Sequence, residues 1–128
     1  MASTTSITIG EHRIGPDHEP YIIAEMSGNH DGSLDKALAI VRMAAEAGAH
    51  AVKLQTYKPE TITLESDAPD FRLSEGHELW GGRTLWDLYT EAHTPWEWHA
   101  PLFEEAAKVG ITIFSSPFDP TAVDLLEE

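Results

Sequence analysis

Short apolar runs alternate with apolar residues at helical spacing along this chain. The runs at residues 21–26 (YIIAEM), 49–55 (AHAVKLQ) and 111–115 (ITIFS) are continuously apolar apart from a few polar positions. Such runs are typical of parallel strands that are covered on both faces. A weaker alternating stretch at residues 7–9 and 12–14 surrounds Gly10, which predicts a small N-terminal β-hairpin over about residues 5–16.

Helical spacing separates these runs. Residues 34–45 repeat apolar positions at steps of three and four, with Ser33 as the expected N-cap and Gly48 as the expected stop. Residues 84–91 predict a short helix. Thr94 to Glu97 match a capping box with proline at the first helical position, so a longer helix is expected from Thr94 to Gly110. Asp119 and the proline after it predict one more helix start.

The predicted order is strand, helix, strand, long excursion, helix, strand, helix. Alternation of this kind indicates an α/β fold with a parallel sheet, either doubly wound or a (β/α)8 barrel. Neither a GxGxxG fingerprint nor a P-loop is present, which weighs against dinucleotide and P-loop folds. The excursion, residues 57–83, is long enough to be functional or mobile. Residues 121–128 resemble the middle of a helix, so we expect the chain to be the front part of a longer protein.

Composition narrows the possible partners. The chain has 128 residues with 22 acidic and 8 basic side chains and a formal net charge of −14, which argues against nucleic acid and anionic membranes as partners. The sequence contains no run of 18 apolar residues, so no transmembrane helix is predicted. The absence of cysteine excludes disulfides and thiolate metal sites, and the first residues show no secretory signal. These features favour a cytoplasmic location.

Polar residues lie at or next to the carboxyl end of each predicted strand of the sheet. Glu25 closes the first strand, Lys53 and Gln55 close the second, and Ser115 and Ser116 close the third. Ligands bind at the carboxyl ends of parallel strands, so these side chains predict a polar pocket. The alternative is a purely structural ion pair between Glu25 and Lys53.

The histidines do not indicate a metal site. They show no ligand spacing, so no complete metal site is predicted in this chain. His30, just past the first strand, is the one histidine that could face a ligand, although packing within the protein is the favoured interpretation. His99 lies on a predicted helix and has only nearby carboxylates as expected partners.

Three motifs carry a family resemblance. Residues 24–30 (AEMSGNH), 52–56 (VKLQT) and 114–119 (FSSPFD), in this order and spacing, resemble the sialic acid synthase family. Residues 82–89 (GRTLWDLY) and 91–99 (EAHTPWEWH) are similar to its pseudaminic acid synthase branch. The resemblance covers nearly the whole chain from about residue 14 onward.

The resemblance implies a fold and a domain boundary. Residues 1–128 would be the N-terminal portion of a (β/α)8 TIM barrel, with the hairpin at about 5–16 and the first three βα units at about 20–128. The rest of the barrel and a small antifreeze-like domain are absent from this chain. A homodimer is expected for the full-length family member.

The resemblance also implies an activity, the condensation of phosphoenolpyruvate with an N-acetylated amino sugar to give a nonulosonic acid and phosphate. Lys53 matches the lysine that binds phosphoenolpyruvate, and Ser116 matches a hydroxyl donor to the same ligand. Ser115, beside it, is a further candidate for substrate binding. Glu25 matches a catalytic acid at the reaction centre, and Gln55 would line the sugar pocket.

A divalent metal, Mn²⁺ or Mg²⁺, is implied as well. It would polarise the sugar aldehyde and would take its ligands from the absent C-terminal part. Two alternatives stay open. One is N-acetylneuraminate synthase, which uses N-acetylmannosamine, and the other is a non-catalytic half-barrel that acts as an assembly or binding piece.

Overall fold

A three-stranded parallel sheet forms the centre of the molecule. In the computed structural model, which describes residues 5–79 and 81–128, the strands are β3 (Ile23–Glu25), β4 (Ala51–Thr56) and β5 (Thr112–Pro117). They pair in the order β3-β4-β5, and both pairings are parallel. The α/β class and the parallel sheet are therefore confirmed.

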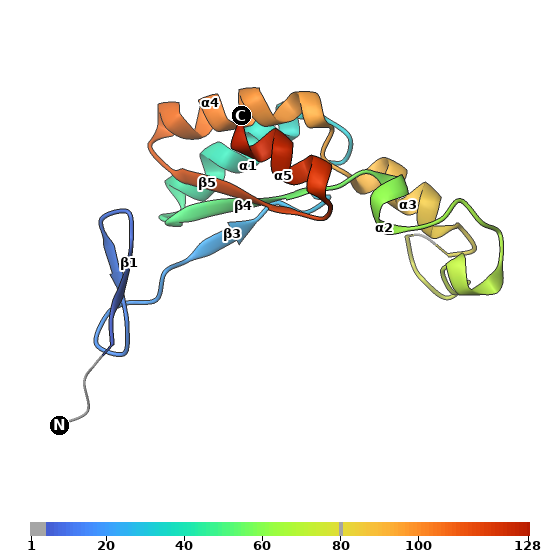
Figure 1. Cartoon of the computed structure of the whole chain (residues 1–128), viewed down its shortest axis with the longest axis horizontal. Helices are drawn as coiled ribbons and strands as arrows, with labels where there is room; N and C mark the ends of the chain where they lie inside the picture. Colours follow the sequence, from blue (N-terminus) through green and yellow to red (C-terminus); the bar gives the residue numbers. More distant parts are fainter. Residues whose placement is uncertain (1–4, 80) are drawn as a thin grey trace.

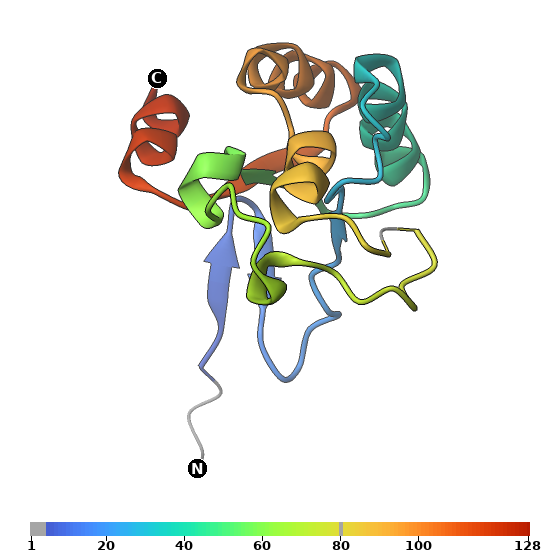
Figure 2. The same cartoon turned by 90° about the vertical axis from the view of Figure 1, so that its right-hand side faces the viewer.

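Helices α1 (Leu34–Glu46), α4 (His99–Val109) and α5 (Pro120–Glu127) lie on one side of this sheet, as Figures 1 and 2 show. Two of them begin where the sequence predicts. The side chain of Ser33 accepts a hydrogen bond from the N–H of Lys36, and that of Asp119 accepts one from the N–H of Thr121. No helix in the described part of the chain is long and apolar enough to cross a membrane.

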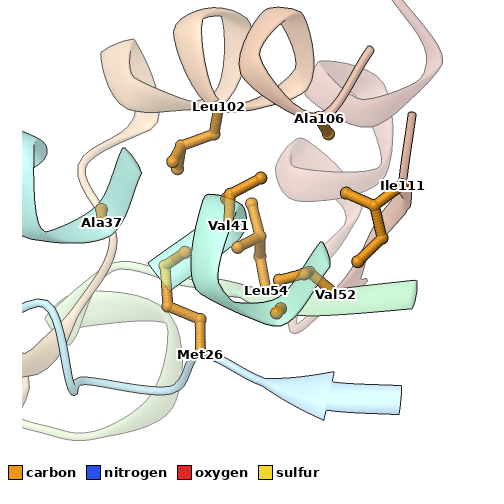
Figure 3. Close-up of a cluster of buried hydrophobic side chains, with 9 residues drawn as sticks. Met26, Ala37, Val41, Val52, Leu54, Leu102, Ala106 and Ile111 are labelled. Atoms are coloured by element: carbon orange, nitrogen blue, oxygen red, sulfur yellow. The ribbon is translucent and has the colours of Figure 1, made fainter. Parts of the chain in front are cut away.

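The hydrophobic core fills the space between the sheet and helices α1 and α4 (Figure 3). Met26, Val52 and Leu54 contribute from the sheet side, and Val41 and Leu102 contribute from the two helices. All five side chains are fully buried. Burial of such side chains contributes about 1.5–3 kcal/mol each, so this layer is the main source of stability.

The opposite face of the sheet is open. Ile23 on β3 and Phe114 on β5 point to that face and are 45% and 38% exposed. The sheet thus has one face covered by helices and one face with apolar side chains in contact with solvent. An uncovered face of this kind marks a place where other protein or a ligand can pack.

The N-terminal hairpin is confirmed. Strands β1 (Ile7–Ile9) and β2 (His12–Ile14) pair antiparallel, and Gly10 supplies the positive φ of 57° at the turn. The ring of His12 lies edge-on to the rings of Tyr21 and His50, with centroids 5.5 Å and 4.9 Å away. The hairpin therefore lies at the amino-terminal end of the sheet (Figure 1).

The excursion lies beyond the opposite, carboxyl end of the sheet and faces the viewer in Figure 2. It is mostly irregular, as predicted, with a short helix α2 (Pro59–Ile62) and a 3-10 turn η1 (Pro69–Phe71). Helix α3 (Leu85–Ala92) follows it, close to the predicted residues 84–91. Thr84 begins α3 through a capping box with Asp87. The excursion is therefore next to the polar carboxyl ends of the strands.

The predicted helix start at Thr94 is wrong. Pro95 has an extended backbone with ψ of 139°, so the chain makes a 3-10 turn, η2 (Trp96–Trp98), and α4 begins only at His99. The side chain of Thr94 is buried, with only 2% of the residue exposed, and it caps no helix. Gly110 ends α4 in the left-handed conformation, as expected.

We expect the 128-residue chain to self-associate in solution. Strands β3 and β5 each pair with β4 alone within the described residues, which leaves two open edges beside the exposed apolar face. Light scattering should show small oligomers rather than precipitate, because the net charge of −14 opposes aggregation at low salt. Ile23→Lys should shift the population toward monomer, and a monodisperse wild-type monomer would contradict the expectation.

Candidate functional site

The polar strand ends meet on the open face of the sheet. The register places Glu25 directly opposite Lys53 and places Gln55 directly opposite Ser116. Because paired residues of parallel strands project to the same side, these four side chains share one face. Four of the five predicted site residues are therefore brought together.

Three of these side chains form a bonded group. The Nζ of Lys53 lies 3.3 Å from one carboxylate oxygen of Glu25, and the amide of Gln55 donates to the other oxygen at 3.0 Å. The Lys53 and Glu25 side chains are 31% and 39% exposed. An ion pair with that much solvent contact contributes only about 0–1 kcal/mol to stability, so the fold does not depend on it.

Ser27, which the sequence analysis did not single out, borders the same group. Its hydroxyl lies 3.5 Å from the amide nitrogen of Gln55, and its backbone has a positive φ of 48°. The side chain of Asn29 donates to the carbonyl of Met26 at 2.9 Å and closes this turn. A positive φ at a non-glycine residue is a feature that clusters at binding sites.

The same loop is packed tightly against the excursion. A Cβ added at Gly28 would lie 3.1 Å from the Cβ of Ala92 and 3.2 Å from its carbonyl oxygen. A side chain at this position would require Ala92 to move, so glycine allows the loop after β3 to approach the end of α3 this closely. The loop after β3 is therefore packed directly against the end of α3.

Ser115 lies on the other face. Its hydroxyl is 2.5 Å from the hydroxyl of Thr56, which is 2.7 Å from the Nε2 of His99. Thr56 is fully buried and His99 is 5% exposed, so this group lies under the helices. The structure does not bring Ser115 together with Lys53.

His30 is an interior residue. It is fully buried, its ring lies edge-on to Trp98 with centroids 5.1 Å apart, and its Nδ1 accepts a hydrogen bond from the N–H of Gly32 at 3.1 Å. Burial lowers the pKa of His30, which keeps the ring neutral at physiological pH. His30 is thus packed in the interior and is not the histidine that faces a ligand.

An aromatic cluster stands beside the strand ends. Tyr57 follows β4 directly and is 5% exposed, and its ring lies edge-on to Tyr89 of α3 and to Phe118 after β5, at 5.7 Å and 5.3 Å. Burial raises the pKa of Tyr57 to about 12. The cluster fastens the excursion to the carboxyl edge of the sheet.

Metal ligands do not gather anywhere in the described residues. Within 5–79 and 81–128, no group of three or more His, Asp or Glu side chains could hold a metal ion. The open-face group offers one carboxylate and one amide oxygen, and the cation Lys53 already occupies the carboxylate. The residues present do not form a metal centre by themselves.

The open-face group can bind an anion and hold a carboxylate near it. A lysine ammonium is a compact charge suited to a carboxylate or a phosphate, and the excursion borders the same edge. An α/β unit with such a group at the carboxyl ends of its strands has the arrangement of an enzyme active site.

Comparison with known proteins then gives the family. The model of the NeuB family matches residues 40–128, and the chain belongs to this family. The match spans β4, the excursion, α4, β5 and α5, and thus includes Lys53, Gln55 and Ser116.

Similar proteins include two bacterial pseudaminic acid synthases. The one from Campylobacter jejuni serotype O:2 is 49% identical over 111 residues, which are 87% of this chain and 32% of that protein. The one from Helicobacter pylori is 47% identical over 108 residues, 84% of this chain and 31% of that protein. The chain thus spans about a third of the length of these relatives.

Solved structures agree with this similarity. An N-acetylneuraminic acid synthetase from Leptospira borgpetersenii superposes with a TM-score of 0.74 at 28% identity, over 97% of this chain and 38% of that one. The Bacillus subtilis spore coat polysaccharide biosynthesis protein SpsE gives a TM-score of 0.65 at 32% identity, over 96% and 30%.

Tyr57 should make the protein sensitive to alkali. Its pKa in the folded state is about 12, above the ordinary value of 10.0, so its contribution to stability is complete below pH 10. As pH rises from 10 to 12 the unfolded chain loses the proton first, and the free energy of unfolding falls. Urea unfolding should show a smaller fall over this range in Tyr57→Phe than in wild type; equal falls would contradict the assignment.

Proposed function

We propose that this chain supplies the substrate-binding front part of a synthase that condenses phosphoenolpyruvate with an N-acetylated amino sugar and releases phosphate. The observation that carries the proposal is the Glu25, Lys53 and Gln55 group on the open sheet face of a NeuB family member. The similarity to pseudaminic acid synthases supports a nonulosonic acid as the product.

The open face has a natural place in this proposal. Residues 1–128 would form the N-terminal part of a (β/α)8 barrel, with the open face turned to the barrel interior and further strands beside β3 and β5. The exposed Ile23 and Phe114 would then be interior side chains. The chain spans about a third of the length of its relatives and superposes on part of longer proteins, and both findings support its assignment as one part of a barrel.

Each residue of the group has a role in the proposed reaction. The Lys53 ammonium pairs with the carboxylate or phosphate of phosphoenolpyruvate, and the hydroxyl of Ser116 donates to the same ligand. Gln55 orients the sugar while it holds one oxygen of Glu25. Glu25 acts at the reaction centre as the acid or base.

The proposed reaction balances without a redox partner. The methylene carbon of phosphoenolpyruvate forms a bond to the aldehyde carbon of the open-chain sugar, and the aldehyde oxygen takes up a proton. Water adds to the former enol carbon and loses a proton. The C–O bond to phosphate then breaks as the new hydroxyl gives its proton to the departing phosphate, which leaves a 2-keto acid and inorganic phosphate.

The proposed reaction includes a divalent cation, Mn²⁺ or Mg²⁺, whose ligands would come from residues outside this chain. The described residues form no metal centre, and we assign its ligands to the remaining part of the protein. We also propose that the complete protein is a cytoplasmic homodimer.

The acceptor distinguishes the candidate enzymes. The similarity to the two pseudaminic acid synthases favours a 2,4-diacetamido-trideoxy hexose over N-acetylmannosamine. Assay of the complete protein with both sugars should release phosphate with the diacetamido sugar, and mass spectrometry should show a nine-carbon acid. Turnover with N-acetylmannosamine alone would favour N-acetylneuraminate synthase, and turnover with neither sugar would contradict both acceptors.

Lys53→Ala in the complete protein should remove most of the affinity for phosphoenolpyruvate. In the proposed complete barrel this contact lies in the interior, where loss of one buried charge-assisted contact to a ligand costs about 2–5 kcal/mol. Calorimetry measures the binding, and circular dichroism checks that the fold is retained. Lys36→Ala is the matched control, because Lys36 pairs with Asp31 at the surface, with 58% of its side chain exposed. Unchanged binding in Lys53→Ala would make the residue a purely structural partner of Glu25.

Glu25→Gln should separate binding from chemistry. Glutamine keeps the size and one acceptor oxygen but cannot serve as an acid or base. Phosphoenolpyruvate affinity should stay within about threefold of wild type, while phosphate release falls by about a hundredfold or more. Equal losses of affinity and turnover would argue against a chemical role.

The 128-residue chain alone should release no phosphate from phosphoenolpyruvate and sugar. Under the proposal it holds Lys53 and Glu25 but not the metal ligands or the remaining barrel strands. A phosphate-release assay with added Mn²⁺ tests this directly. Measurable release that disappears in Lys53→Ala would show that the chain by itself contains a working site.

A further inference from the structure

A series of hydrogen-bonded side chains runs under the proposed site, with Thr56 and His99 buried and Ser115 half-buried. It begins at Ser115 on β5, passes through Thr56 on β4 and ends at His99 on α4. Each strand residue is the immediate neighbour of a proposed substrate contact, because Gln55 precedes Thr56 and Ser116 follows Ser115. The chain therefore links both contacts to the helix layer.

The hydrogen bonds of this chain have a definite direction. The Nδ1 of His99 lies 3.1 Å from the carbonyl oxygen of Trp96, which can only accept, so Nδ1 carries the hydrogen. Burial lowers the pKa of His99, so its Nε2 is bare and accepts the hydroxyl hydrogen of Thr56. Thr56 has no second hydrogen, and Ser115 must donate to it.

We propose that His99, Thr56 and Ser115 are positioning residues that hold Gln55 and Ser116 in the positions where they contact substrate. This inference rests on the proposed function. The three side chains bond β4 to β5 and both strands to α4 at the carboxyl edge. Backbone pairing between β4 and β5 ends at Thr56 and Pro117, so these side-chain hydrogen bonds join the two strands where their backbone pairing ends. Small displacements of a positioned group reduce rates strongly.

Substitution of Thr56 in the complete protein tests the proposal. Thr56→Val keeps the shape and removes both hydrogen bonds, whereas Thr56→Ser keeps the hydroxyl. We expect Thr56→Val to lower kcat/KM by about tenfold or more. Its KM for the sugar, which Gln55 contacts, should rise, and Thr56→Ser should restore most of the loss. His99→Leu should resemble Thr56→Val, because it removes the acceptor.

A stability control separates positioning from simple loss of packing. Val41→Ala creates a cavity between α1 and the sheet without touching the hydrogen bonds of Thr56, and should lower the unfolding midpoint without raising KM. Equal kinetic losses in Thr56→Val and Thr56→Ser, or a KM change in Val41→Ala matching that of Thr56→Val, would overturn the proposal. If wild-type protein has no synthase activity, the proposed function fails instead.

The direction of the chain has a readout that needs no substrate. A long-range ¹H–¹⁵N spectrum of the His99 ring in the 128-residue chain should show a hydrogen on Nδ1 and a bare, hydrogen-bonded Nε2. Thr56→Val should shift the Nε2 resonance, because it loses its donor. A hydrogen found on Nε2 in wild-type protein would contradict the arrangement.

Discussion

The parallel register of β3, β4 and β5 is the constraint on which the site depends. It sets Glu25 against Lys53 and Gln55 against Ser116, although these residues come from three separate parts of the chain. A one-residue shift of β3 against β4 would turn Glu25 toward the helices, and the same shift of β5 would turn Ser116 toward them. The buried core side chains Val52 and Leu54 prevent that shift, because they would lose their contacts with α1 and α4. Packing on one face thus determines the chemistry on the other.

The two faces of the sheet divide the polar residues into two groups with different environments. On the open face, Lys53 and Glu25 keep partial contact with solvent, so their ion pair can exchange for a ligand at little cost to the fold. On the covered face, Thr56 and His99 are buried and hydrogen-bonded to each other. Polar groups that are buried and satisfied in this way hold their neighbours in place.

Much of this arrangement could be predicted from the sequence. The apolar runs, the N-caps Ser33 and Asp119, and the polar strand ends are local signals, and the structure confirms the elements they predict. The errors have non-local causes. The backbone of Pro95 is extended although the local pattern is that of a capping box.

Side-chain direction was the other part that the sequence could not supply. Ser115 and Ser116 are adjacent and chemically alike, and only the register of β5 decides which one faces the site. The partner of His99 lies 43 residues away, so no spacing rule could find it. Ser27 reaches Gln55 through a positive φ that its residue type does not indicate.

The most direct test of the central claim is a crystal structure of the complete protein with phosphoenolpyruvate bound. The account predicts that the ligand lies on the open face of the sheet, with the Nζ of Lys53 within hydrogen-bonding distance of its carboxylate or phosphate and the hydroxyl of Ser116 beside it. Phosphoenolpyruvate bound elsewhere, with Lys53 still paired only to Glu25, would contradict the account.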